Sequence, residues 1–282
     1  MLRFGCSQII IDRVDPLVNP AQIPSPHMHQ IVGGNAFNAS IPSADQYREL
    51  FNDKFTTQTS GGFVVYYVSD GKNKVTAFKP GFRMLVGDAT QRTKIGSGRK
   101  SQSCFRCYTG PNFGGDNAAP CQDANCWDGV NLDSPDHKSH VAYPKNGPQQ
   151  FTGTSTGGAC PSTHPVKIPQ IMLEIVWDTT AFNNKADWPA DGSQPFVLST
   201  GDNTGYSQHG DYVFGWKGDS LQRAMDGGPC TGASCAGLKE MAMGAEKACK
   251  VPRLYPENAD GCKFELHPSP CSYWQLVMRE AS

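Results

Sequence analysis

The sequence predicts a mainly β protein, with residues 1–282 forming a single domain of antiparallel strands arranged as a sandwich or jelly roll with few short helices. Glycine (30) and proline (21) are abundant and only 18% of residues are charged, which is more typical of a loop-rich β protein than of a helical bundle. The clearest periodic segments are short and rich in β-branched and aromatic residues. Most of the 11 cysteines lie among Gly, Pro, Asn and Ser, which indicates long loops stapled by disulfides.

The N-terminal part of the chain is expected to supply most of the strands. Residues 63–68 (FVVYYV) are the clearest case, because every side chain is aromatic or β-branched and a Gly-Gly pair precedes them. Ser43 and Gln46 form the capping box of a short helix. In chain order we predict a strand at 6–14, a helix at 43–51, and strands at 63–68, 75–78 and 82–86 that follow one another as a meander.

The rest of the chain combines a long excursion with further elements. Residues 90–150 are polar and rich in Cys, Gly and Pro, so we expect disulfides to hold them as a capping or functional excursion. Residues 168–179 (IPQIMLEIVWDT) are apolar on both faces, which predicts a central strand. We also predict a strand at 196–200, a helix at 220–225 capped by Asp219 and Ser220, a helix at 234–250 and a last strand at 273–278.

Charge and cysteine content narrow the location of the protein and its partners. The net charge of −1 argues against nucleic acid, no apolar run is long enough to cross a membrane, and we expect a monomer. The odd number of cysteines leaves one thiol without a partner in this chain, and disulfides are favoured over a zinc site built on Cys104 and Cys107. Asn38 begins an N-glycosylation sequon, which together with the cysteines predicts a secreted, extracellular protein.

A proline-rich segment at residues 15–37 (DPLVNPAQIPSPHMHQIVGGNAF) contains the first candidate site. Its prolines exclude a helix and favour a stiff, extended chain. In such a chain His27 and His29 lie on one face, because side chains two residues apart point the same way. We expect the two imidazoles to contact substrate or to bind a divalent metal, zinc or copper, with manganese or calcium if a carboxylate joins them. The alternative is that both rings hydrogen-bond the backbone of a Pro-rich turn.

The second candidate site is the run His209-Gly210-Asp211, which we expect at the exit of a strand. His209 would act as a general base or acid, and Asp211 would orient its ring. His164 is a further catalytic candidate, and any of these three residues could supply a third metal ligand. The alternative is that Asp211 only ties a loop.

Aromatic residues beside these segments suit a carbohydrate ligand, because exposed rings stack on sugars. We expect substrate contacts from His140, Tyr206, Tyr212 and Trp216. Two or three of the aromatic residues Trp127, Tyr143, Tyr206, Tyr212 and Trp216 are instead expected in the core. A paired-carboxylate glycosidase on Glu174 and Asp178 stays open, whereas a serine nucleophile is poorly supported because the chain lacks a G-x-S-x-G elbow.

Four long motifs resemble, in order and spacing, a large family of secreted fungal proteins classed as a domain of unknown function. They lie at residues 15–37, 126–144 (CWDGVNLDSPDHKSHVAYP), 160–179 (CPSTHPVKIPQIMLEIVWDT) and 199–216 (STGDNTGYSQHGDYVFGW). The resemblance implies a secreted, disulfide-bonded fungal protein. Some relatives carry WSC modules linked to carbohydrate binding, so it also implies a wall polysaccharide as the setting, but it carries over no catalytic residues.

The chain departs from that family pattern after the sequon at residues 38–40. Family members continue there through a cysteine pair and a Tyr-Trp-Thr run, whereas here Ser43 leads directly into Ala44-Asp45-Gln46. Without that segment Cys6 is the cysteine expected to stay unpaired, and part of a binding surface would be absent.

These observations predict a carbohydrate-active enzyme, a hydrolase or lyase acting on cell-wall polysaccharide through a His/Asp site. The alternative is a non-catalytic protein that binds wall polysaccharide or acts as an effector. It is supported by the same aromatic residues and by the lack of a recognised nucleophile motif. Product formation on a polysaccharide would distinguish the two.

Overall fold

The computed structural model describes residues 2–6, 8–33, 54–55, 62–69, 74–93, 107–108, 115–116, 125–145, 158–176, 184–191, 193, 196, 198–228, 230, 235, 238–240 and 251–255. Its strands are β1 (Leu2–Cys6), β2 (Gln8–Asp12), β3 (His29–Val32), β4 (Lys54–Phe55), β5 (Gly62–Val68), β6 (Arg83–Gly87), β7 (Cys107–Tyr108), β8 (Gly115–Asp116), β9 (Cys126–Trp127), β10 (Val141–Ala142), β11 (Val166–Lys167), β12 (Gln170–Val176), β13 (His209–Val213) and β14 (Lys239–Glu240). The helical segments are a 3-10 turn, Lys185–Asp187, and the helix α1, Ser220–Asp226. The predicted mainly β fold with few short helices is confirmed, while the choice between sandwich and jelly roll stays a prediction.

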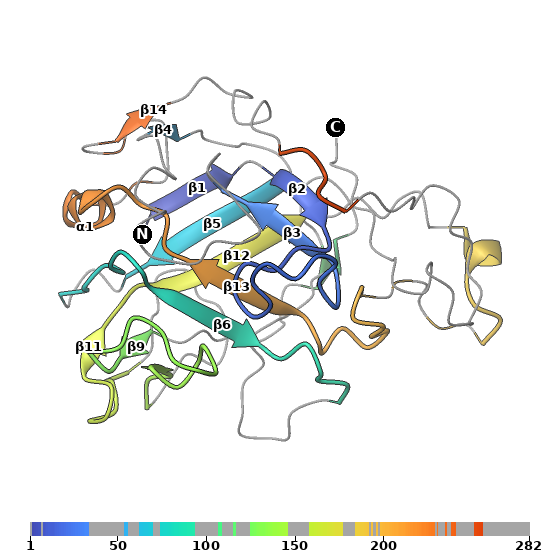
Figure 1. The fold of residues 1–282 in the computed structure, drawn as a ribbon, viewed down its shortest axis with the longest axis horizontal. Coiled ribbons are helices and arrows are strands. Elements are labelled where there is room, and N and C mark those ends of the chain that lie inside the picture. The colour runs from blue at the N-terminus through green and yellow to red at the C-terminus, as the bar shows by residue number, and fades with distance from the viewer. Residues whose placement is uncertain are drawn as a thin grey trace.

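Of the two three-stranded sheets in the described part of the chain, the one with the longer strands is antiparallel and has the order β1-β5-β12 (Figure 1). β5 forms where the sequence predicted the clearest strand, and it lies in the middle, with Val65 paired to Phe4 on one side and to Leu173 on the other. The prediction of a central strand at 168–179 is wrong for the described sheet, because β12 lies at its edge. Leu173 is accordingly 41% exposed despite its apolar side chain.

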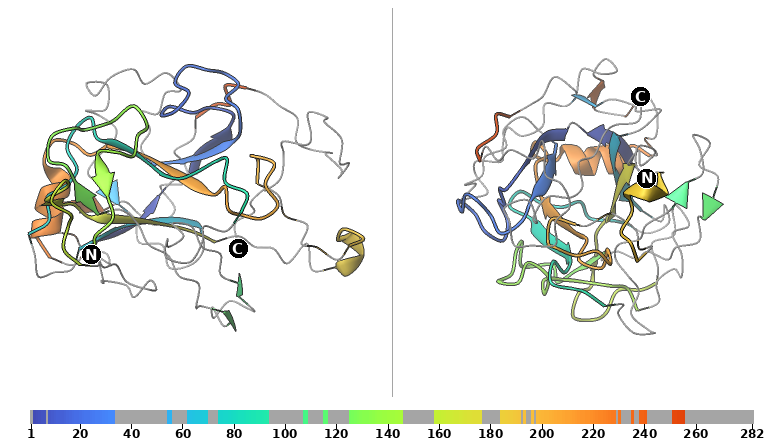
Figure 2. Two further views of the ribbon diagram at one scale, coloured as in Figure 1. Left: turned by 90° about the horizontal axis from the view of Figure 1, so that it is seen from below. Right: turned by 90° about the vertical axis from the view of Figure 1, so that its right-hand side faces the viewer.

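A second layer lies over this sheet and consists of two antiparallel pairs, β6–β13 and β2–β3 (Figure 2). Tyr212 of β13 reaches down to Tyr67 of β5, with ring centroids 6.4 Å apart. Gly210 of β13 lies so close to β12 that a Cβ there would come within 3.2 Å of Leu173 Cδ1. The small residue at position 210 therefore lets the two layers approach each other.

One hydrophobic core fills the space between the layers and extends under α1. Buried members come from β1, β5, β6, α1 and the segment after β13; among them are Leu2, Tyr67, Phe82, Met84, Phe214 and Leu221. Trp216 joins them and donates its indole N–H to the Tyr67 hydroxyl at 2.9 Å, so its polar atom is satisfied inside the core. The helix predicted at 220–225 is confirmed as α1, although Asp219 makes no side-chain cap and instead pairs with Arg223.

Disulfides and a small sheet organise the described part of the predicted excursion. β9 pairs with both β10 and β11, and Cys126 of β9 forms a disulfide with Cys160. This bond excludes Cys126 as a zinc ligand and confirms that disulfides staple the loops. A second disulfide joins Cys230 to Cys235. Cys6 forms no disulfide with any cysteine that the structure describes, as expected, and burial raises the pKa of its thiol to about 12.

The predicted meander is wrong, whereas the strand predicted at 6–14 forms in part. Residues 8–12 are β2, which pairs with β3 and leads into the proline-rich segment as expected, while Cys6 is the last residue of β1, which pairs with β5. β6 forms within one residue of its prediction, but its partner is β13 rather than a sequence neighbour. Hydrophobic alternation marks a strand without saying which other strand it will pair with.

Three further predicted elements take other forms. Residues 75–78 are buried but form no strand, because the Ala77 N–H donates to the Gln222 side chain at 2.8 Å. The strand predicted at 196–200 is replaced by a turn at residues 198–202. The Gly201 N–H closes this turn by donating to the Leu198 carbonyl at 2.8 Å. Within the predicted helix at 234–250, residues 239–240 are the short strand β14, parallel to β4.

Several predictions lie outside the described residues. These are the helix at 43–51, the sequon at Asn38, the last strand at 273–278, and most of the helix at 234–250. In the part of the chain that is described, none of the helices combines the length and apolar character needed to span a membrane.

Candidate functional site

Residues 13–28 form a loop that returns the chain from β2 to β3 and is closed by backbone hydrogen bonds. Asp15 organises its first turn: Oδ1 accepts the N–H groups of Leu17 at 2.9 Å and Val18 at 2.8 Å. Farther along, the Ser25 N–H donates to the Arg13 carbonyl at 2.8 Å, and Arg13 Nε donates back to the Ser25 carbonyl at 2.7 Å. The prolines and these bonds together hold the loop in one shape.

Ser199, from the turn before β13, holds the His-Met-His run. Its Oγ accepts the Met28 N–H and donates to the Met28 carbonyl, both at 3.2 Å. Met28 is thereby tied down between the two histidines, and the ring centroids of His27 and His29 lie only 4.4 Å apart. The predicted convergence of these two side chains is confirmed.

β13 supplies His209 and Asp211, which lie two residues apart and therefore project from the same face of the strand. The sequence placed His209 at a strand exit, but β13 begins there. Its ring is held by the Ser207 carbonyl, 3.0 Å from Nδ1, and not by Asp211 as predicted. With Nδ1–H donating to that carbonyl, Nε2 is left with its lone pair.

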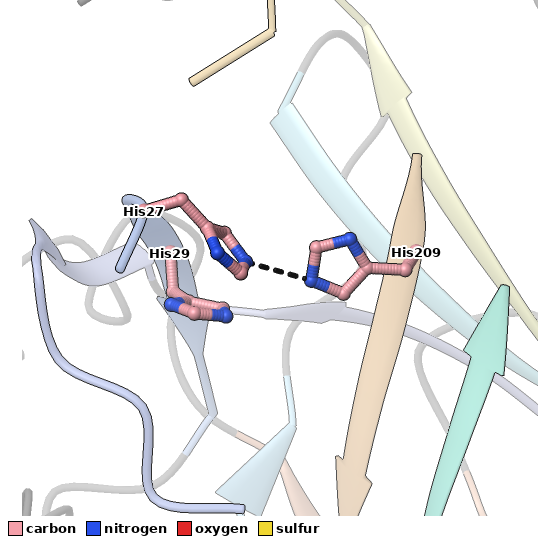
Figure 3. Close-up of side chains that lie close together, drawn as sticks. All are labelled: His27, His29 and His209. Carbon is pink, nitrogen blue, oxygen red and sulfur yellow. Dashed lines mark hydrogen bonds between the residues drawn. The ribbon is translucent and has the colours of Figure 1, made fainter. Parts of the chain in front are cut away.

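Five side chains from the loop, β3 and β13 meet at one place, which we call the histidine cluster: Asp15, His27, His29, His209 and Asp211. The ligand atoms of the three histidines all lie within 4.8 Å of one another, and so do those of Asp15, His29 and Asp211. Figure 3 shows the rings of His27 and His209 pointing toward each other, with Nε2 atoms 3.0 Å apart. His29 belongs to both groups and links the imidazoles to the carboxylates.

The polar atoms at the centre of the cluster lack partners. Among the described residues, neither ring nitrogen of His29 and neither carboxylate oxygen of Asp211 has a hydrogen bond, although all four atoms are buried. The closest approach between the two residues is 3.6 Å, from His29 Nε2 to Asp211 Oδ2. Buried polar groups are nearly always paired in folded proteins, so this arrangement is unusual.

Burial dominates the electrostatics of the cluster. Burial, assisted by the neighbouring His209, lowers the pKa of His27 to about 4. Burial and the adjacent His27 lower the pKa of His29 to about 3. Burial raises the pKa of Asp211 to about 6. Although burial also acts to raise the pKa of Asp15, His29 and the hydrogen bonds from Asn19, Val18 and Leu17 hold it below its usual value. His27 and His29 are therefore neutral at pH 7.

The two other predicted histidines lie elsewhere and make local hydrogen bonds. His164 has its ring nitrogens 2.9 Å from Thr163 Oγ1 and 3.0 Å from the Ser139 carbonyl, and it is not part of the histidine cluster. His140 is 1% exposed and bonds Ser134 Oγ and the Arg83 carbonyl, so it is a core residue and not a substrate contact.

The predicted aromatic contacts divide between core and surface. Trp216 is buried, and Tyr212 packs against Phe78 and hydrogen-bonds Tyr67, so neither is available to a sugar ring. Burial raises the pKa of Tyr212 well above its usual value. Tyr206, at 38% exposure, remains accessible on the loop that leads into β13.

The alternative sites gain no support. Glu174 accepts a hydrogen bond from the Tyr66 hydroxyl, and its proposed partner Asp178 lies outside the described residues. The hydroxyl of Ser199 is engaged with both polar groups of the Met28 backbone, and among the described residues it makes no hydrogen bond to a histidine that could act as a base.

Sequence reasoning missed Asp15. Its Asp-Pro pair opens the same proline-rich segment that carries both histidines, and this was the available signal. The sequence predicts no role for Asp15, because the residue meets His29 and Asp211 only once β3 and β13 come together in the folded chain.

A family model described as "Domain of unknown function (DUF1996)" matches residues 44–216. The chain therefore belongs to this family. The matched region contains His209 and Asp211 together with the three later motifs, while the segment carrying Asp15, His27 and His29 precedes it. Comparison with curated proteins and with solved structures finds no match.

Proposed function

We propose that this protein is a secreted enzyme, a hydrolase or lyase, that acts on extracellular wall polysaccharide at the histidine cluster. The observation that carries the proposal is the meeting of three imidazoles and two carboxylates from distant parts of the chain, with the polar atoms of His29 and Asp211 buried and unpaired. Side chains in such unfavourable surroundings are concentrated at functional sites, because catalysis needs groups with shifted proton affinity.

The cluster contains groups of both kinds that cleavage of a glycosidic bond requires. The lone pairs of neutral imidazoles can accept a proton during the reaction, and Asp211, whose pKa burial raises to about 6, is partly protonated at mildly acidic pH and can donate one. In hydrolysis a base takes a proton from water, the water oxygen bonds to the anomeric carbon, and an acid protonates the departing glycosidic oxygen. In a lyase the base instead takes a carbon-bound proton of the sugar, a carbon–carbon double bond forms as the glycosidic C–O bond breaks, and the acid protonates the departing oxygen. Tyr206, exposed on the neighbouring loop, supports a sugar as substrate.

The test is incubation of the full chain with chitin, glucans, cellulose, mannan, xylan and pectin. New reducing ends indicate hydrolysis, and unsaturated sugar ends indicate a lyase. His29→Ala and Asp211→Asn are each expected to lower the rate by about 100-fold or more. His164→Ala is the matched control, because that ring lies outside the cluster, and it should leave the rate unchanged. Absence of product from folded wild-type protein on every substrate would contradict the proposal.

The exposed tyrosines also favour a second candidate function, binding of a wall polysaccharide without turnover. Tyr143 and Tyr206 are 37% and 38% exposed, which leaves their rings able to stack on sugars. Retention on an insoluble polysaccharide that survives His29→Ala but is lost in Tyr206→Ala, with no product formed, would support binding alone.

A further inference from the structure

The histidine cluster has the donor set, spacing and burial of a metal centre. At its centre is His29, whose side chain is 10% exposed and whose ring nitrogens have no hydrogen-bond partner among the described residues. Asp211 beside it is 12% exposed and has neither oxygen paired. An unpaired buried imidazole and an unpaired buried carboxylate are each unfavourable, and a cation bound to one ring nitrogen, with the carboxylate accepting from the other, would satisfy both.

The distances between the imidazoles suit one shared ion. The Nε2 atoms of His27 and His209 are 3.0 Å apart, and the ligand nitrogens of all three rings lie within 4.8 Å of one another. Two nitrogens bound to one ion at about 2.0–2.1 Å are separated by roughly 3–3.4 Å for bond angles between a right angle and a tetrahedral one. In the absence of an ion, neutral rings use the same contact as a hydrogen bond donated by His27 Nε2–H to His209.

The surroundings prepare the nitrogens for this role. The Ser207 carbonyl takes the Nδ1–H of His209 at 3.0 Å, which leaves Nε2 as the lone-pair donor directed at His27. Ser199 ties down Met28 between the other two histidines. Histidines that bind metals are commonly oriented in this way by a carbonyl or carboxylate on the second ring nitrogen. The His209 ring, and the backbone between the other two histidines, are thus positioned before any ion binds.

Charge balance is also provided. Asp211 and Asp15 bring carboxylates to within 4.8 Å of the His29 ligand atom. Asp15 is already satisfied by the N–H groups of Leu17 and Val18, whereas Asp211 is not. Asp211 is therefore the carboxylate that supports the ion, by taking the second N–H of His29.

We propose that His27, His29 and His209 bind one divalent transition-metal ion, zinc or copper, with Asp211 as the carboxylate that orients His29. Three neutral imidazoles select these ions over calcium and magnesium, which prefer oxygen ligands. Three protein ligands leave a coordination position for water or substrate. Water held there would lose a proton more readily, so it, and not a free imidazole, would serve as the base of the proposed function, on which this step rests.

The first test measures metal in the full chain, purified without a histidine tag and then stripped with a chelator. About one zinc or copper ion per chain is expected before stripping. Zinc and copper, added separately, should rebind and raise Tm, whereas calcium should do neither. Less than about a tenth of an ion per chain, together with a Tm unchanged by zinc, copper or manganese, would overturn the proposal.

Variants assign the ligands. His29→Ala should weaken zinc binding by more than 100-fold, and Asp211→Asn by about 10- to 100-fold, the range typical of groups that orient a ligand. His164→Ala removes a histidine outside the cluster and should bind zinc like wild type. Equal binding by all three variants would place the ion elsewhere and overturn the assignment.

A measurement on wild-type protein covers the case in which a variant fails to fold. The electron paramagnetic resonance spectrum of the copper-loaded chain should show hyperfine coupling to imidazole nitrogens, and a spectrum with oxygen ligands only would contradict the proposal. Turnover is measured on the same loaded and stripped samples. If the chain binds metal but forms no product, only the proposed enzymatic function is contradicted. If product still forms after the metal has been stripped, only the role of the ion in turnover is contradicted.

Discussion

At the residue scale, Gly87 decides where His209 can lie. The two residues are directly paired between β6 and β13, and Gly87 has a φ of +91°, in the left-handed region. A Cβ at this position would lie 2.6 Å from the Gln208 carbonyl oxygen and 2.9 Å from His209 Cα. Only glycine combines this backbone conformation with so close an approach, so the entry of β13 into the cluster depends on it.

Gly87→Ala is expected to destabilise the protein by about 3 kcal/mol or more, since the strain of a positive φ is added to a backbone clash. Gly201→Ala is the matched control: its φ is +76°, but a Cβ there meets nothing within 4 Å. It should cost only about 1–2 kcal/mol. Urea unfolding of both variants measures the difference, and equal losses would show that the contact with His209 is unimportant.

The residue scale also explains why the pKa values of Asp211 and Asp15 shift in opposite directions, although both residues are carboxylates beside His29. Asp15 accepts hydrogen bonds from its own loop, which stabilise its charged form and keep its pKa low. Asp211 lies in a strand whose N–H and carbonyl groups pair with β6, so no local donor reaches its oxygens. Backbone geometry therefore assigns one carboxylate a structural task and leaves the other for an ion or a proton.

At the element scale, a turn from one part of the chain positions a strand from another. The turn at residues 198–202 is closed by backbone bonds, and Asp202 accepts the N–H groups of Thr204 and Ser207, each at 2.8 Å, so the run into β13 is rigid. Ser199 then bonds both polar groups of the Met28 backbone. The start of β3 is thereby held to the loop that precedes β13, and the histidines of both elements stay in register.

Ser199→Ala removes both of these bonds and should destabilise the protein by about 1–2 kcal/mol. Because the bonds act on the backbone beside His27 and His29, amide hydrogen exchange at residues 28–32 should accelerate more than exchange in β5. Ser162→Ala, at an exposed turn position, is the control and should change neither quantity. Uniform acceleration across the sheet would instead indicate a general loss of stability.

At the scale of the whole molecule, acid sensitivity should follow from histidines buried without charge. His140 packs against Phe82, with ring centroids 5.3 Å apart, and burial lowers its pKa below the usual value of 6.5. The unfolded chain therefore binds a proton at this residue at a higher pH than the folded chain does. Its contribution to stability is complete above about pH 6.5 and is lost as the pH falls below that value.

His140→Gln tests this effect, because glutamine keeps both a donor and an acceptor but does not titrate. Urea unfolding of chelator-treated protein from about pH 7.5 down to about pH 5 should show a steeper loss of stability for wild type than for the variant. The histidine cluster is present in both proteins, so the difference between the two curves isolates His140. Parallel curves would show that His140 does not contribute to the pH dependence.

Much of the fold follows from local sequence patterns. The β-branched and aromatic run at 63–68 formed β5, the alternation at 168–179 formed β12, and Asp219-Ser220 began α1. These signals act over a few residues, through the period of a strand or the start of a helix. Pairing is different: β6 joined β13 rather than a sequence neighbour, and β2 joined β3 while the adjoining β1 joined β5, because strand partners are selected by packing of the whole core.

The candidate site shows the same division. By itself the sequence determined that His27 and His29 would share a face, since that inference needs only the two-residue repeat of an extended chain. It also named His209 and Asp211 as one candidate site, but the Ser207 carbonyl, and not Asp211, holds the His209 ring. Only the tertiary structure decided that His27 meets His209 across 182 residues, that Asp15 joins them, and that His164 and His140 do not. The physical reason is that these contacts depend on how two layers of strands stack, which burial of the entire core determines and no local pattern encodes.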